Sequence, residues 1–294
     1  MVQELAQSGA LYLVATPIGN LADMSARAIR TLGEVDLVAA EDTRRTRQLL
    51  THFGLAKPLV SYYRENEERR QGEILDQIKE GKKVALVSDA GMPGISDPGN
   101  KLVSAAIQAG IPVIPIPGPT ALIAALAASG QGTERFVFEG FLPRSGKPRR
   151  ERLAALATEE RTIVLYEAPH RLPETLKDLL RLLGGERQVT VARELTKIHE
   201  EFWRGTLQEA VAEFTARELK GEFTLVVAGG SFAKVELSPE ELLDRVEELI
   251  QDGKSPSEAI RAVAERAGIS RRELYTAYQN SRREPRGEQK WKTK

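Results

Sequence analysis

The chain has 294 residues, 41% of them hydrophobic, and no net charge from 42 basic and 42 acidic side chains; this composition supports globular cores and excludes general disorder. It has no cysteine and only three histidines, so disulfides, zinc–thiolate sites and thiol nucleophiles are excluded and we expect no metal site. Its apolar runs fall short of the about 20 residues that a membrane helix needs, and its start lacks the order of a signal peptide, so we expect a cytoplasmic protein without membrane contact.

The first half alternates short apolar runs with helical patterns. One helix is predicted to begin at Asp42, which is a plausible N-cap. Another is predicted to begin at Ser96-Asp97-Pro98, where a capping residue precedes a proline. Strand–helix alternation predicts a mostly parallel sheet covered by helices. The predicted strands are 10–15, 35–40, 83–88 and 111–116, and the other predicted helices are 25–32, 42–53, 65–80 and 119–129.

The second half continues with strands and helices. The basic segment 144–152 contains a Gly-Lys-Pro break, and we expect it to be a mobile loop that leads into a helix. The predicted strands are 135–140, 162–166, 189–192, 200–204 and 223–228, and the predicted helices are 173–183 and 207–218.

From residue 238 the pattern changes to three short helices without strands. Ser238 with Glu241 and Ser255 with Glu258 have the spacing of capping boxes. The tail after Ser281 is expected to be disordered. We therefore predict one α/β domain over 1–118, a second over 119–235, and a small helical unit over 236–294.

Three loops that follow strands have the composition of ligand loops. They are residues 16–20, 89–99 and 117–121, which are rich in glycine and proline. Ligands of open parallel sheets bind beyond the carboxyl ends of the strands, so these loops are expected to share one crevice. For any one loop, simple punctuation of the chain explains the composition equally well. Phosphate cradling is unsupported, since the chain has neither a Walker pattern nor Gly-x-Gly-x-x-Gly.

Eight stretches of the chain are specific when taken together: LYLVATPIGNLADMSARA (11–28), AAEDTRRTRQLL (39–50), VALVSDAGMPGISDPG (84–99), IPIPGPTALIAAL (114–126), FEGFLPR (138–144), YEAPHR (166–171), ARELTKIHEE (192–201) and GEFTLVVAGG (221–230). They resemble the tetrapyrrole methylase superfamily and more closely its RNA-modifying branch. The resemblance implies two α/β domains of the tetrapyrrole methylase type plus a small C-terminal helical unit, a homodimer, and S-adenosylmethionine bound in the cleft between the α/β domains. It also implies 2′-O-methylation of a cytidine ribose in 16S rRNA of the small ribosomal subunit.

The same resemblance implies where the cofactor binds. The loop after the strand at 83–88 would meet the methionine end, the loop after the strand at 111–116 would approach it, and the second domain would hold adenine. The implied cofactor-binding residues are Asp89, Gly91, Met92, Pro93, Ile95, Thr120, Ala121, Tyr166, Ala192, Phe223 and Thr224.

The chemistry needs a positioned hydroxyl and a group that accepts its proton. The catalytic candidates are Glu41, Asp42, Arg44 and Lys197, and further carboxylates that qualify as bases are Asp89, Glu167 and Glu194. Simpler roles are equally open: Asp42 as a helix cap beside solvated arginines, and Lys197 in a structural ion pair. His170 is a base candidate with the same ambiguity.

RNA contact is expected to be local, because the whole chain is neutral. From residue 253 on, eleven lysines and arginines stand against five acids, and residues 255–279 have a helix–turn–helix pattern. The segment 144–152 is a second candidate, and a solvated charged face is the alternative for both. Tyr62, Tyr63, Tyr166 and Trp203 are the plausible aromatics for base stacking.

Two other functions compete with RNA methylation. A methylase of a tetrapyrrole or of a protein side chain is disfavoured by the basic helical tail, which a small substrate does not require. A non-catalytic RNA-binding assembly factor would bind the cofactor without turnover.

Overall fold

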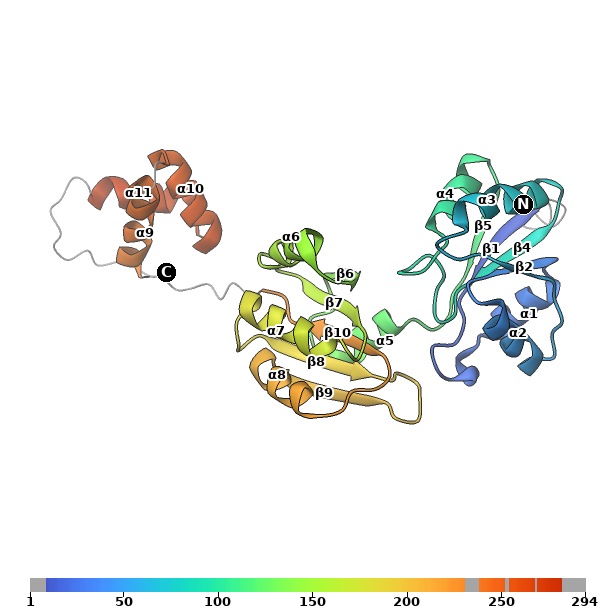
Figure 1. Cartoon of the computed structure of the whole chain (residues 1–294). Helices are drawn as coiled ribbons and strands as arrows, with labels where there is room; N and C mark the ends of the chain where they lie inside the picture. The colour runs from blue at the N-terminus through green and yellow to red at the C-terminus, as the bar shows by residue number, and fades with distance from the viewer. Residues whose placement is uncertain (1–8, 231–237, 252–253, 268, 282–294) are drawn as a thin grey trace. The chain divides into compact units, whose positions relative to one another are not determined.

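The computed structural model describes residues 9–230, 238–251, 254–267 and 269–281. The contacts divide the chain into two compact units, Met1–Gly229 and Gly230–Lys294, and each is described by itself (Figure 1). The first unit contains two five-stranded sheets, and the second contains helices. The predicted fold class is thereby confirmed, the domain boundaries at 118 and 235 remain predictions, and the tail after Ser281 lies outside the described residues.

The first sheet is entirely parallel, with the strand order β3-β2-β4-β1-β5. Its short edge strand β3 is absent from the sequence prediction. The strands are β1 (Ala10–Val14), β2 (Leu37–Ala40), β3 (Leu59–Ser61), β4 (Lys83–Val87) and β5 (Val113–Ile116), and the helices are α1 (Ala26–Glu34), α2 (Thr43–His52), α3 (Glu67–Lys79) and α4 (Asn100–Gln108).

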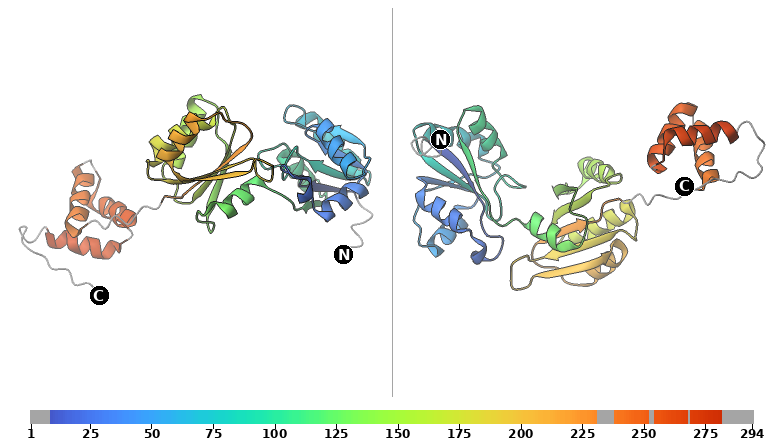
Figure 2. Two further views of the ribbon diagram at one scale, coloured as in Figure 1. Left: turned by 90° about the horizontal axis from the view of Figure 1, so that it is seen from below. Right: turned by 180° about the vertical axis from the view of Figure 1, so that it is seen from behind.

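Helices cover both faces of this sheet (Figure 2). Alternate strand residues serve opposite faces: Val38 packs in a core with α1 and α2, whereas Leu86 packs in a core with α3 and α4. Burial on both faces explains the uninterrupted apolar strands, and each fully buried Val or Leu contributes about 1.5–3 kcal/mol. The carboxyl ends of the strands are left to the loops.

The second sheet is mixed, in the order β6-β7-β10-β8-β9, with only β6 and β7 parallel. Helix α5 packs on one face and α6, α7 and α8 pack on the other. The strands are β6 (Phe136–Phe141), β7 (Thr162–Glu167), β8 (Gln188–Arg193), β9 (Glu201–Thr206) and β10 (Phe223–Val227), and the helices are α5 (Ala121–Ser129), α6 (Gly146–Leu156), α7 (Leu172–Leu183) and α8 (Leu207–Ala216).

Two local predictions are wrong. The segment predicted as a mobile basic loop is helical from Gly146, because the buried Arg149 donates to Asp178 at 2.9 Å and to Thr175 at 3.1 Å. Helix α4 does not open at Ser96 but at Asn100, after a glycine, so the Ser-Asp-Pro segment belongs to a loop.

The second unit consists of α9 (Pro239–Gln251), α10 (Pro256–Ala267) and α11 (Arg271–Ser281). Both predicted capping boxes form, with Ser238 and Ser255 exchanging hydrogen bonds with Glu241 and Glu258. A small core around Ile260 packs the three helices together. Within the described ranges, no helix has the length and apolar character to cross a membrane.

Candidate active site

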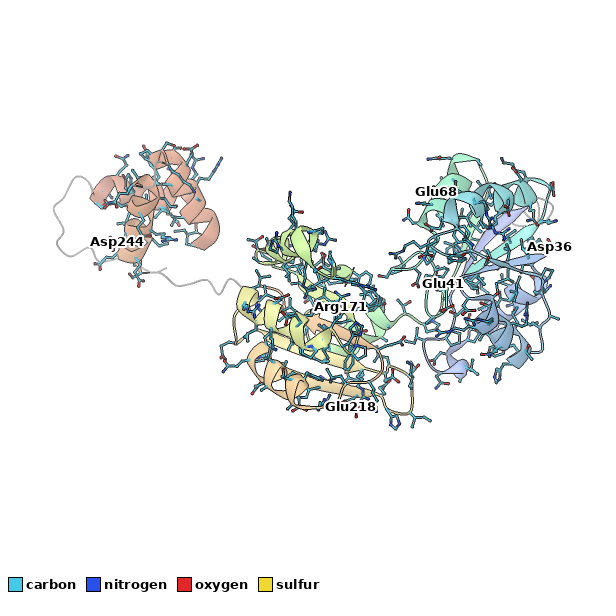
Figure 3. The ribbon with its side chains drawn as sticks, in the orientation of Figure 1. Asp36, Glu41, Glu68, Arg171, Glu218 and Asp244 are labelled. Atoms are coloured by element: carbon cyan, nitrogen blue, oxygen red, sulfur yellow. The ribbon has the colours of Figure 1, made fainter. Side chains whose placement is uncertain are left out.

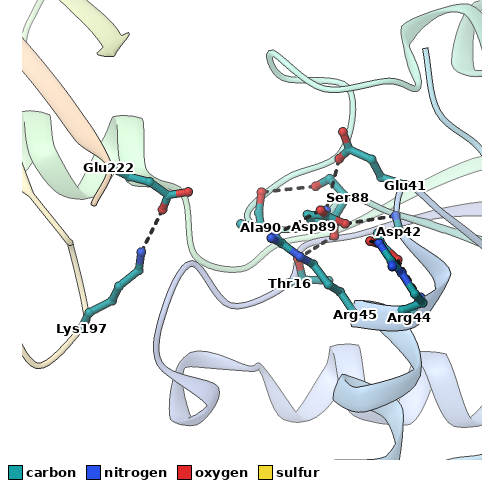
Figure 4. Close-up of polar contacts among 10 residues, drawn as sticks. All are labelled: Thr16, Glu41, Asp42, Arg44, Arg45, Ser88, Asp89, Ala90, Lys197 and Glu222. Carbon is teal, nitrogen blue, oxygen red and sulfur yellow. Dashed lines mark hydrogen bonds and ion pairs between the residues drawn. The ribbon is translucent and has the colours of Figure 1, made fainter. Parts of the chain in front are cut away.

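Two loops are joined at the carboxyl end of the first sheet. The loop after β1 and the loop after β4 pair through Thr16 and Gly91, whose N–H groups donate to each other's carbonyl oxygens at 2.9 and 3.0 Å. Thr16 Oγ1 also donates to the carbonyl of Ser88 at 3.1 Å, beside Glu41 and Asp89 (Figure 4). The pairing fixes both loops where parallel strands place a ligand site.

A cavity of about 310 Å³, called the first cavity, opens beside these paired loops. The loops after β1, β4 and β5 form part of its wall, and residues of β6, β7 and β10 complete it. Its volume is at the lower end of the range of small-molecule sites. Both sheets of the first unit therefore contribute to one ligand-sized cavity.

The walls of the first cavity fit S-adenosylmethionine, the cofactor that the family resemblance implies. That molecule carries a sulfonium and an ammonium cation and a planar adenine. Glu222 supplies a carboxylate for a cation, and Phe141, Tyr166 and Phe223 supply rings against which a base can pack.

Gly91 keeps the cavity wall open. Its φ of +81° favours glycine, and a Cβ there would fill the space between Ile18 Cγ2 at 3.6 Å and the Pro119 carbonyl at 3.8 Å. Across the cavity, the Tyr166 hydroxyl accepts a hydrogen bond from the N–H of Leu122 at 3.0 Å, which fixes the ring. The cavity is thus preformed on both sides.

A carboxylate cluster lies between the cavity and the first sheet. Burial raises the pKa of Glu41 (Figure 3), although its carboxylate accepts a hydrogen bond from the N–H of Asp89 at 3.3 Å, which acts in the opposite direction. Burial, followed by the negative charge of Glu41, raises the pKa of Asp97 to about 7, and Arg64 opposes this change. Asp97 lines the first cavity, so a carboxyl group that titrates near neutrality faces the proposed cofactor site.

Asp42 and Arg44 form a surface pair. The Asp42 carboxylate accepts hydrogen bonds from the backbone N–H of Arg44 at 2.8 Å and from the Arg44 side chain. Asp42 therefore caps α2, which is the alternative to a catalytic role that the sequence left open. The side-chain hydrogen bond from Arg44 lowers the pKa of Asp42 to about 2, so this carboxylate is a poor proton acceptor. Neither residue lines the first cavity.

Lys197 lies in a loop beside the cavity. Its Nζ donates to Glu194 at 2.8 Å and to Glu222 at 2.9 Å, and Glu222 is part of the cavity wall. Burial opposes the charge of Lys197, but the two carboxylates outweigh it and raise its pKa. A Cβ at Gly19 would overlap Lys197 Cγ, so this loop packs closely against the loop after β1.

Glu167 is held by structural contacts. It is buried and accepts hydrogen bonds from Thr175 at 2.6 Å and from the N–H of Ala168 at 2.9 Å, and Arg171 lies 3.3 Å away. These partners occupy both of its oxygens, which favours a structural role over that of a base. His170 is exposed and does not line the cavity.

Most of the predicted cofactor residues line the first cavity, but three do not. Asp89 lines a second cavity, described below, Pro93 is buried in its loop, and Ala192 is buried in the core under α5. The sequence prediction omitted two residues that line the first cavity. Asp97 lies in the loop after β4, where the sequence predicted the start of a helix, and Glu222 lies just before β10. Those of the predicted residues that do line this cavity are Gly91, Met92, Ile95, Thr120, Ala121, Tyr166, Phe223 and Thr224.

The second cavity, of about 290 Å³, lies between α2 and the same two loops. Arg45 Nη1 lies 3.2 Å from Asp89 Oδ2 in its wall. Among the described side chains, no group of three or more histidines and acids is arranged to hold a metal ion.

The comparison with protein families agrees with this architecture. The sequence profile of the tetrapyrrole (corrin/porphyrin) methylases matches residues 10–211, which is more than half of the chain. The chain belongs to this family.

Relatives with high identity share one name. The ribosomal RNA small subunit methyltransferase I of Synechocystis sp. is 57% identical over 268 residues, covering 91% of this chain and 96% of the relative. The protein of the same name from Halalkalibacterium halodurans is 51% identical over 283 residues, covering 94% and 96%.

Solved structures show the same fold. Uroporphyrin-III C-methyltransferase from Thermus thermophilus, in complex with S-adenyl homocysteine, has a TM-score of 0.55 at 23% identity and covers 75% of this chain and 97% of that one. Diphthine synthase has a TM-score of 0.58 at 16% identity, covering 74% and 90%. At these identities the likeness concerns the fold alone.

Proposed function

We propose that this protein transfers a methyl group from S-adenosylmethionine to a ribose 2′-hydroxyl of a cytidine in 16S rRNA of the small ribosomal subunit. The observation that carries the proposal is the first cavity, whose carboxylates and aromatic rings suit this cofactor, in a chain at least 51% identical to the two relatives named ribosomal RNA small subunit methyltransferase I. The residues that would hold the cofactor are Gly91, Tyr166, Glu222 and Phe223.

The bound cofactor would supply a methyl group already activated by its positive sulfur. The protein then has to hold the acceptor hydroxyl in line with that methyl group, exclude water and take up one proton. The apolar part of the cavity wall, which includes Ile18, Met92 and Leu195, excludes water. The paired loops at Thr16 and Gly91 keep the wall in position.

Asp97 is the proposed proton acceptor. A base works best when its pKa lies near the operating pH, and burial together with Glu41 places that of Asp97 at about 7. Asp42 and Glu167 are occupied by partners, and Glu194 is paired with Lys197. Lys197 would then act as a positioning residue, because it holds Glu222 at the cavity rim.

RNA contact beyond the site is proposed for the helical unit within the predicted domain 236–294. Exposed cations lie on or beside α10 and α11, namely Lys254, Arg261, Arg271 and Arg272. Such charges bind phosphates by releasing counterions. We also propose a cytoplasmic location, from the composition, and a homodimer, as the family resemblance implies; light scattering of the purified protein tests the dimer.

The deciding experiment is transfer of a radiolabelled methyl group from S-adenosylmethionine to purified small ribosomal subunits, followed by mapping of the labelled nucleotide. Label on a cytidine ribose of 16S rRNA is expected. Cofactor binding without transfer would favour an assembly factor, and label on ribosomal protein would favour a side-chain methylase.

A further inference from the structure

The second cavity has no role in the reaction as described so far. It lies at the carboxyl end of the same sheet and shares its wall with the first cavity. Ile18, Ala90 and Gly91 line the first cavity, while their neighbours in the same loops line the second. Those neighbours are Thr16, Pro17, Gly19, Ser88 and Asp89.

Helix α2 forms the other wall of the second cavity. Arg45, Gln48, Leu49 and His52 follow one another at helical spacing and therefore occupy one face of the helix. The sequence of α2, TRRTRQLLTH, has three arginines and no acid. Arg44 is paired with Asp42, so the guanidinium that α2 presents to the cavity is that of Arg45.

The lining divides into an apolar part and a part that donates hydrogen bonds. Pro17, Leu21 and Leu49 are apolar, and Leu21 is 41% exposed. Gln48 and His52 are exposed polar side chains. This combination suits a planar, polar ring: apolar groups cover its face, and donors and acceptors meet its edge.

Two lining residues are held in place by neighbours. The ring of His52 packs edge-on against Phe53, with the centroids 4.9 Å apart. Arg45 uses Nη1 on Asp89 at 3.2 Å, and a guanidinium has five N–H donors, so most remain for a phosphate. Asp89 is fixed in turn by the N–H of Asp42 at 3.1 Å. Such preorganisation lowers the entropy cost of binding.

We propose that the second cavity binds one nucleotide of a single RNA strand, beside the acceptor ribose in the first cavity. His52 and Leu21 contact the base, Gln48 hydrogen-bonds its edge, and Arg45 binds its phosphate. The volume of about 290 Å³ suits one unstacked nucleotide and not a duplex. The inference rests on the proposed function, and it adds how the enzyme recognises the strand around its target.

Variants of α2 test the proposal. Gln48→Ala and His52→Ala change exposed side chains in the cavity wall, and Arg47→Ala changes an exposed side chain of the same helix outside it. The measurements are KM and kcat for methyl transfer to unmethylated small ribosomal subunits, and the Kd for S-adenosylmethionine by calorimetry.

We expect KM for the subunits to rise about three- to tenfold in Gln48→Ala and about five- to fiftyfold in His52→Ala. The Kd for S-adenosylmethionine is expected to stay within twofold, and Arg47→Ala is expected to change KM by less than about threefold. KM values equal to wild type, or no larger than in Arg47→Ala, would overturn the inference while the wild type still methylates. Absence of transfer by the wild type would instead refute the proposed function.

Discussion

Replacing Asp97 by asparagine is expected to stabilise the protein and to inactivate it. The carboxyl group lies in the wall of the first cavity, where burial and the charge of Glu41 raise its pKa from 3.8 to about 7. Asp89 acts in the same direction, and Arg64 and the Ser88 hydroxyl oppose them. Asparagine has the same shape and no charge, so Asp97→Asn removes the unfavourable ionisation.

The sign follows from proton linkage. Below pH 3.8 the carboxyl group is protonated in both the folded and the unfolded protein, and it costs nothing. As the pH rises toward about 7, the unfolded chain ionises first, so stability falls through this window and then levels off. Without solvent screening, this loss in the free energy of unfolding would be about 4 kcal/mol at pH 8. Since Asp97 is partly exposed, we expect about 1–2 kcal/mol.

Scanning calorimetry of the α/β unit measures this difference. A gain of about 1–2 kcal/mol corresponds to a rise in Tm of about 2–8 °C at pH 8 for a unit of this size, and the rise should be less than half as large at pH 5. Glu34→Gln, at an exposed acid of α1, is the control and should show no such pattern. Methyl transfer by Asp97→Asn should fall about 10²–10⁴-fold. A Tm at pH 8 no higher than that of wild type would refute the burial argument.

Four further predictions concern the cavity walls, the second sheet and the tail. Gly91→Val should weaken S-adenosylmethionine binding at least about tenfold in calorimetry, because a branched side chain at φ +81° is strained and narrows the first cavity. Asp89→Ala should weaken it less, because Asp89 faces the second cavity; a larger loss than in Gly91→Val would contradict this placement. Arg149→Ala should lower the free energy of unfolding by about 1.5–3 kcal/mol in urea titration, because it removes the hydrogen bonds to Asp178 and Thr175 while Asp178 keeps Arg181, and an effect below about 1 kcal/mol would contradict that. Removing residues 238–294 should leave cofactor affinity unchanged and reduce the salt dependence of RNA binding by about one log–log unit for each lost phosphate contact; an unchanged slope would move the contact elsewhere.

Local chemistry in the sequence determined much of the fold. The apolar runs of β1, β2 and β4 are strands whose alternate residues are buried on opposite sheet faces, as a sheet covered by helices on both sides requires. Asp42, Ser238 and Ser255 cap helices as predicted, because a cap satisfies backbone groups only a few residues away. The sequence motifs, taken together, also suffice to indicate the family.

Tertiary contacts decided the features that the sequence misplaced. The basic segment around Arg149 is part of a helix because Arg149 is held by Asp178 and Thr175. These partners lie 29 and 26 residues away in the sequence, so a local pattern does not predict them. Helix α4 starts late because Gly99 adopts φ +136° and its N–H donates to the buried Glu67 at 3.1 Å. Neither partner is visible in a local pattern.

The site shows the same division. Sequence motifs located the loops that follow β1, β4 and β5, because ligand sites of parallel sheets form at strand ends. Only the folded chain placed Asp97 in the first cavity, turned Asp89 toward the second, and brought Glu41 close enough to raise the pKa of Asp97. Burial and charge proximity are properties of the assembled sheet, and a linear sequence does not contain those distances.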